Sequence, residues 1–271
     1  MKKYLIFLLC LFSLLIFSYL SFFKPDKSEL FPLFLIGTIA AFLGTLAGGG
    51  ALITVPSMML IGIPIQSSIA TNKFSSGIAA ISSVFYLLRH KQLNVKSILS
   101  LLAVACIGGI SGACLTVQID ERSMNILAFV LLCVALFVTM KSQHWTRSAL
   151  KQDPDKKTVS YLPFLIALYD GGFGPGSSTF SILYYLKSCQ NYMAAAQMTR
   201  VLILGSCSGA FLIYVQTGFI HWPYAIALAA GSTLGSQIGL MMLPKLPAKT
   251  AKRLLLLIIL LLIAQMLNKL V

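Results

Sequence analysis

The sequence predicts an all-α, polytopic membrane protein with two inverted repeats. Each repeat is expected to contain a glycine-broken hairpin followed by three helices, and one extra transmembrane helix precedes both. Of the 271 residues, 58% are hydrophobic and only 10% are charged. Apolar runs of about 20 residues, enough to cross a bilayer as a helix, recur along the chain. Glycines and prolines interrupt two of these runs, and the same order of features returns in the second half.

The formal net charge of +14 reflects membrane topology. The basic residues gather in loops beside apolar runs, at Lys2-Lys3, Arg89–Lys96, Lys141–Lys157 and Lys245–Arg253. This is the distribution of basic residues in loops that face the cytoplasm. It accounts for the positive charge, so we expect no nucleic-acid partner.

The boundaries follow from these runs. Residues 1–29 are predicted to form an N-terminal transmembrane helix and an outer loop, with the first repeat at 30–141. A cytoplasmic basic linker at 142–160 and the second repeat at 161–271 complete the chain. A signal peptide is the alternative for Tyr4–Phe23, but its core is too long and no small-residue cleavage site follows.

The first repeat opens with an apolar run from Leu30 to Ile63, too long for one crossing and broken at Gly44–Gly50. The following helices are expected at Pro64–Leu88, Ile98–Ile119 and Met124–Met140. Glycine and proline are the weakest helix formers, so the break predicts two short helices joined by a turn.

The second repeat opens with Tyr161–Leu186, broken at Tyr169–Ser178 by four glycines and a proline. Small or polar residues recur in both halves at a nearly constant spacing. The pairs are Gly44 and Gly172, Gly48 and Gly176, Thr71 and Thr199, Gly108 and Gly235, and Gly112 and Gly239. Five pairs in register indicate an internal duplication.

Loop charge then sets the orientation of the repeats. If all basic loops face the cytoplasm, each broken run must cross the membrane an even number of times, as a hairpin. The first repeat then starts outside and the second inside. Inverted repeats whose broken helices meet near the midplane are an architecture of secondary transporters.

Three charged residues fall within the apolar runs near these hairpins. Asp170 is the sole carboxylate in any apolar run, and an intramembrane acid is a functional candidate. Lys73 and Arg200 are expected near the bilayer centre, where a charge is costly unless paired or hydrated. With one acid and two cations the cavity is net positive, and helix N-termini at the hairpin tips also favour anions.

These observations predict an anion site. The predicted substrate-binding residues are Asn72, Lys73, Arg200, Gly48, Gly49, Gly176, Ser177 and Ser178, with Thr179 as a further hydroxyl donor. Asp170 is assigned to coupling or to an ion pair. The alternative is a structural Asp170–Arg200 pair with Lys73 reaching the surface, and tip glycines that serve helix packing alone.

The sequence resembles the TauE/SafE, or sulfite exporter, family from about Leu30 to Leu267. The residues that carry the resemblance are Gly44–Gly50 with Pro56, Ala70–Lys73 and Tyr169–Gly176. It implies a bacterial plasma-membrane carrier for sulfite or organosulfonates, in either direction. The family pattern continues with Thr-Gly, where this chain has Ser177-Ser178.

We therefore expect a secondary transporter that moves small anions by alternating access, with a small anion and the lipid bilayer as partners. An anion channel and a non-transporting assembly protein are the alternatives. No G-x-S-x-G, no H-E-x-x-H and no second buried carboxylate is present, so we expect no enzyme. The six cysteines form no C-x-x-C pair, and we expect no disulfide framework, metal or cofactor. Coupling to protons through Asp170, coupling to sodium, and a homo-oligomeric state all remain open.

Overall fold

The computed structural model describes residues 27–93, 95–149, 161–189 and 191–244. These residues form nine α-helices and no strand. In chain order they are α2 (Lys27–Ala47), α3 (Ala51–Leu60), α4 (Ile65–Arg89), α5 (Val95–Val117), α6 (Glu121–Ala149), α7 (Leu162–Gly172), α8 (Ser177–Cys189), α9 (Tyr192–Thr217) and α10 (Trp222–Met242). The predicted all-α class is confirmed for this part of the chain.

Four of these helices are long and apolar enough to cross a membrane: the stretches Leu30–Ala47, Ile98–Val117, Tyr192–Thr217 and Trp222–Met242. The shorter apolar helices α3 and α7 have only 10 and 11 residues. At 1.5 Å per residue they reach roughly half-way through a hydrocarbon layer of about 30 Å. Short helices of this kind fit the predicted hairpins.

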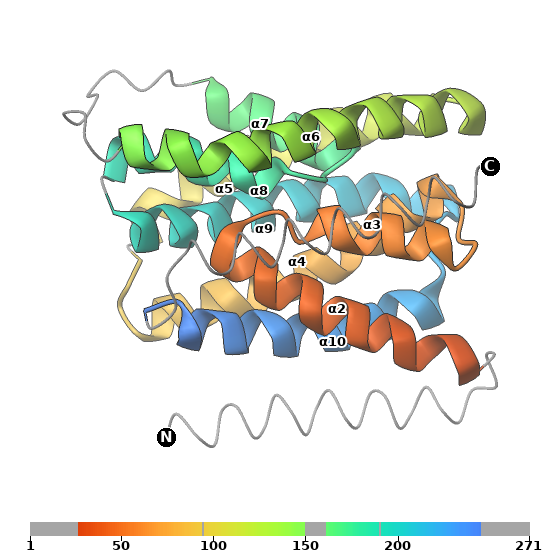
Figure 1. Ribbon diagram of the computed structural model, residues 1–271, viewed down its shortest axis with the longest axis horizontal. Coiled ribbons are helices and arrows are strands. Elements are labelled where there is room, and N and C mark those ends of the chain that lie inside the picture. The colour runs from red at the N-terminus through yellow and green to blue at the C-terminus, as the bar shows by residue number, and fades with distance from the viewer. Residues whose placement is uncertain (1–26, 94, 150–160, 190, 245–271) are drawn as a thin grey trace.

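Both broken runs fold back on themselves. In Figure 1, α2 enters the bundle from the right-hand side and α3 returns to that side. The second hairpin, α7 and α8, enters from the left and returns to the left. The turns fall at residues 48–50 and 173–176, within the two predicted breaks, although Gly171 and Gly172 still belong to α7.

Helices of one half pack against helices of the other. Helix α2 packs on α10, and α5 packs on both α7 and α9. The glycines of α5 and α10 make these approaches close: a Cβ at Gly112 would overlap the carbonyl oxygen of Leu168 on α7. A Cβ at Gly235 would likewise overlap the carbonyl oxygen of Thr38 on α2. Small residues at helix contacts allow this backbone-to-backbone packing.

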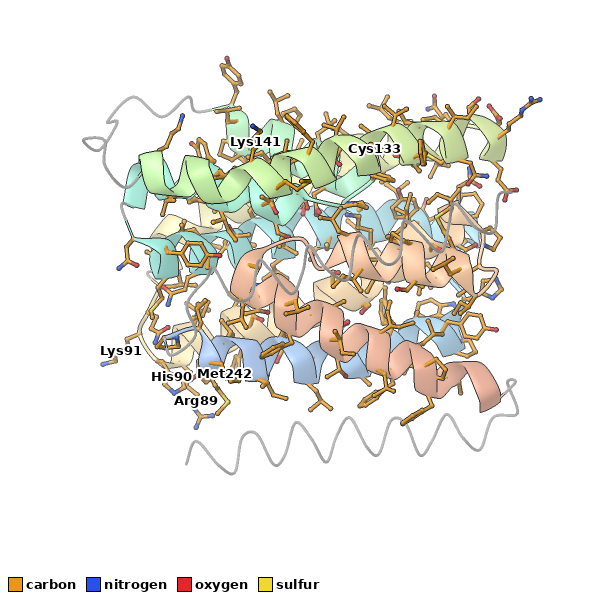
Figure 2. All side chains as sticks on the ribbon, in the orientation of Figure 1. Arg89, His90, Lys91, Cys133, Lys141 and Met242 are labelled. Carbon is orange, nitrogen blue, oxygen red and sulfur yellow. The ribbon has the colours of Figure 1, made fainter. Side chains whose placement is uncertain are left out.

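Basic residues gather at one end of the bundle. Figure 2 shows Arg89, His90 and Lys91 together at the end where α10 finishes with Met242. The turn between α5 and α6 lies at the opposite end (Figure 1). There Ser123 donates its backbone N–H to Asp120, which caps α6 and lowers the pKa of that exposed carboxyl.

Two predicted segments lie outside the described residues: the N-terminal helix at Tyr4–Phe23 and the last part of the second repeat, after residue 244. The linker expected from residue 142 differs from the structure, since α6 continues to Ala149. The residues that follow Met140 are polar but contain no glycine or proline before Pro154. Polarity therefore marked the end of the apolar run and not the end of the helix.

Candidate functional site

The tips of the two hairpins touch each other inside the bundle. Gly48 and Gly176 turn the chain with φ angles of 78° and 86°, in the left-handed region that glycine adopts readily. A Cβ at Gly48 would lie 3.1 Å from the backbone nitrogen of Thr179 and 3.2 Å from the carbonyl carbon of Ser178. Two segments far apart in the sequence thus meet backbone to backbone.

A pocket lies beside this meeting point. Both hairpins together with α4, α9 and α10 line it, and part of it is open to solvent. Three charged side chains belong to its wall: Lys73, Asp170 and Arg200. Their exposed fractions are 1%, 4% and 8%, so the pocket brings three charges into the interior of an apolar bundle.

Asp170 is paired with Lys73. The Nζ of Lys73 on α4 lies 3.2 Å from Oδ1 of Asp170 on α7. The Ser177 hydroxyl donates to the same oxygen at 2.5 Å. On the other oxygen, Oδ2, the Ser206 hydroxyl donates a hydrogen bond and the Cys207 thiol lies 3.7 Å away. Both oxygens of the carboxylate are therefore bound by donors.

This pairing corrects one alternative drawn from the sequence. A structural Asp170–Arg200 pair with Lys73 at the surface is wrong, because Lys73 is almost fully buried and holds the acid itself. Arg200 makes no hydrogen bond and no ion pair with any residue that the structure describes. A buried cation without a partner is destabilising, so Arg200 is costly unless something else pairs with it.

The short helices that follow each tip begin at the pocket. Gly50 and Ala51 at the start of α3, and Ser177 and Ser178 at the start of α8, are wall residues. In the described part of the chain, the amides of Gly50, Ala51 and Ser178 donate to no backbone carbonyl. Free N–H groups at helix starts carry a partial positive charge and bind anions.

The carbonyl groups at the ends of the preceding helices are, by contrast, satisfied by tyrosines. The Tyr192 hydroxyl donates to the carbonyl oxygen of Leu46 at 2.7 Å, near the end of α2. The Tyr214 hydroxyl donates to that of Gly172 at 3.1 Å, at the end of α7. Each of these two helix ends thus has a terminal carbonyl capped by a tyrosine of α9.

Comparison with known proteins identifies the family of the chain. The family model described as Sulfite exporter TauE/SafE matches residues 33–266. The chain belongs to the TauE/SafE family. A probable membrane transporter protein (ORF9) of Sinorhizobium sp. is 32% identical over 83% of this chain and 87% of its own.

Further TauE/SafE-like relatives are more distant. One from Haemophilus influenzae, named probable membrane transporter protein, is 30% identical over 78% of this chain and 83% of its own. The Escherichia coli K12 probable membrane transporter protein YfcA is 26% identical over 76% and 78%. No solved structure matches the chain significantly.

The structure places most of the residues predicted for this TauE/SafE site on the pocket wall. The residues on the wall are Asn72, Lys73, Asp170, Ser177, Ser178 and Arg200. Gly48, Gly49 and Gly176 instead shape the turns, and the wall carries Gly44 and Gly50 in their place. The Thr179 hydroxyl is buried and has no partner among the described residues, but it lies outside the wall.

Sequence reasoning missed several polar wall residues of the TauE/SafE pocket: Thr54, Ser76, Cys207 and Ser232. A helical signal for one of them existed, since Ser76 lies one turn after Asn72 on the same face of α4. The other three belong to separate helices, and only packing brings them to Asn72. In the described ranges, no three His, Cys, Asp or Glu side chains are grouped to hold a metal ion.

Proposed function

We propose that this TauE/SafE member is a secondary transporter for small sulfur-containing anions, sulfite or organosulfonates, in the bacterial plasma membrane. Its relatives are named as membrane transporters, and its family is named for sulfite export. The pocket supports an anionic substrate independently of these names, because its charged wall residues sum to one excess positive charge.

Arg200 is the observation that carries the proposal. Its guanidinium is buried in the wall, while Asp170, the sole acid there, is held by Lys73. A guanidinium offers a planar fork of donors that fits two oxygens of a sulfonate or sulfite. Arg200 therefore binds the anion, together with the free amides at the starts of α3 and α8.

Alternating access between inverted repeats is the mechanism we infer. The packing of α5 on α7 has a counterpart in the packing of α10 on α2, as expected for two halves related by a two-fold axis. The hairpins enter from opposite ends of the bundle (Figure 1). We assign the end with Arg89 and Lys91 to the cytoplasm, since basic loops favour that side.

The test is binding and counterflow of labelled methanesulfonate with purified protein in liposomes. Arg200→Gln should weaken binding by about 2–5 kcal/mol, because the anion loses its charged partner. Arg200→Lys keeps the charge but loses the fork, and should give an intermediate loss. The matched control is Arg122→Gln, at an exposed position on α6.

Three outcomes would contradict the proposal. Unchanged affinity in Arg200→Gln would remove this cation from the site. Flux that fails to saturate with methanesulfonate, and shows no counterflow, would favour an anion channel over a carrier. Absence of any flux in intact, folded protein would favour the non-transporting assembly protein.

A further inference from the structure

The orientation of the Asn72 side chain is fixed within the pocket. Its carboxamide oxygen, Oδ1, accepts a hydrogen bond from the Thr54 hydroxyl at 2.8 Å and one from the Ser76 hydroxyl at 3.3 Å. Thr54 belongs to α3, whereas Ser76 lies one turn along α4 from Asn72. The Asn72 side chain is 2% exposed, so two elements hold it in place.

The Asn72 amide nitrogen is consequently a free donor. Since both hydroxyls bind the oxygen, the NH₂ group, Nδ2, is left on the other side of the carboxamide. Both hydrogen bonds of the Asn72 side chain with described residues go to its oxygen. Asn72 is a wall residue, so this group adds two N–H donors to the Arg200 guanidinium and the helix-start amides.

The strong acceptors of the wall are all occupied. Asp170 receives Lys73 and Ser177 on Oδ1 and Ser206 on Oδ2, and the Asn72 oxygen receives two hydroxyls. The side-chain acceptors that remain in the described wall are neutral hydroxyl oxygens, those of Thr54, Ser76, Ser177, Ser178 and Ser232, and that of Ser232 already accepts from Ser75. A neutral hydroxyl accepts more weakly than a carboxylate, and it can rotate to donate instead.

We propose that this pocket selects anions whose oxygen atoms carry no hydrogen, and that Asn72, positioned by Thr54 and Ser76, sets that selectivity. The inference rests on the proposed anion site and narrows its substrate class to fully deprotonated oxyanions such as sulfonates. An anion with an O–H group would place that hydrogen beside N–H donors, with only neutral hydroxyls to accept it. Burying a donor without a good acceptor weakens binding substantially, and so does a contact between two like-polarised hydrogens.

Methanesulfonate and methylphosphonate provide a direct comparison. At mildly acidic pH both are monoanions of nearly the same shape, but the phosphonate retains one hydrogen on oxygen. Thermal-shift titration of the full-length protein with each anion should show tighter binding of methanesulfonate by about tenfold or more, the size of one unsatisfied buried donor. The readout is the ratio of the two affinities, which general changes in stability do not move.

Variants of Asn72 and Thr54 should change this ratio. Asn72→Asp places a free acceptor in the wall, so both anions weaken but the preference for methanesulfonate falls at least about threefold or reverses. Thr54→Val removes one of the two hydroxyls that hold Asn72 and should lower the ratio by a smaller factor. The control is Ser83→Ala, a buried serine of α4 whose hydroxyl donates to Ala79 instead.

The outcomes separate this inference from the proposed function. Equal affinity of the wild-type protein for the two monoanions would overturn the selectivity proposal while leaving the anion site standing. An unchanged ratio in both Asn72→Asp and Thr54→Val would overturn the role of Asn72. Binding of neither anion by the folded wild-type protein would overturn the anion site itself, and the selectivity proposal with it.

Discussion

The two hairpins share a layout but differ in chemistry. The turn after α2 is built from glycines alone, Gly48–Gly50, whereas the turn after α7 leads into Ser177 and Ser178. Two residues before the matched glycines Gly44 and Gly172, the first half has Phe42 and the second has the acid Asp170. The first hairpin therefore contributes backbone and the Thr54 hydroxyl to the pocket, whereas the second contributes a charge together with the hydroxyls of Ser177 and Ser178.

The following helices, α4 and α9, differ in the same way. Asn72 follows Thr71 as Arg200 follows Thr199, so an amide and a guanidinium occupy matched positions. The next residue is Lys73 in the first half and Val201 in the second. Each half thus supplies one cation, but Lys73 is neutralised by the acid of the other half while Arg200 is not. The predicted duplication accounts for the shared frame of the site, and the differences between the halves account for its single excess charge.

The largest effect is expected on stability, in variants that distinguish the paired cation Lys73 from the unpaired cation Arg200. Asp170→Asn leaves the Lys73 ammonium buried without its partner, and should destabilise the protein by about 3–5 kcal/mol. Arg200→Gln removes a cation that is already unpaired, so without ligand it should be neutral or stabilising. Thermal unfolding in detergent, without added anion, measures both.

The double variant Lys73→Gln/Asp170→Asn is the control for the pair. Removing both charges should restore most of the stability lost in Asp170→Asn, and the double-mutant cycle gives the coupling. If Asp170→Asn and Arg200→Gln shifted unfolding equally and in the same direction, the contrast between a paired and an unpaired cation would be lost.

Sequence reasoning reached the fold class, the two breaks and the charged residues of the site because each has a local signal. Glycines mark the turns, and Lys73, Asp170 and Arg200 stand out as charges in apolar runs. The choice of partner for Asp170 had no such signal, since it depends on how α4 and α9 lie against α7. The hydroxyls of Thr54 and Ser232 were missed for the same reason: buried serine and threonine are common in helix contacts, and only packing distinguishes a wall residue.

An intermediate effect is expected from Gly48→Ala. A Cβ at Gly48 meets the backbone of the other hairpin tip at 3.1 Å, and its φ of 78° is unfavourable for alanine. We expect a loss of about 2 kcal/mol in stability, together with weaker methanesulfonate binding, because the tips must move apart.

The matched control is Gly62→Ala. Gly62 has a φ of 94°, but no atom lies within 4 Å of the position of its Cβ. This variant carries the backbone strain without the contact, and should lose about 1 kcal/mol with normal anion binding. Equal behaviour of the two variants would mean that contact between the tips does not hold the pocket in shape.

The smallest effect should come from the tyrosines that cap the hairpins, and it tests whether the halves are capped alike. Both belong to α9: Tyr192 donates to Leu46 at the end of α2, and Tyr214 donates to Gly172 at the end of α7. Tyr192→Phe and Tyr214→Phe should each cost about 1 kcal/mol, the usual net value of one hydrogen bond. Tyr161→Phe, at a site 65% exposed, is the control and should be close to neutral.

Comparable losses, measured by thermal unfolding, would indicate that one helix of the second half supports both tips. A loss confined to Tyr214→Phe would show that the first tip is held by its glycine contact with the second hairpin alone.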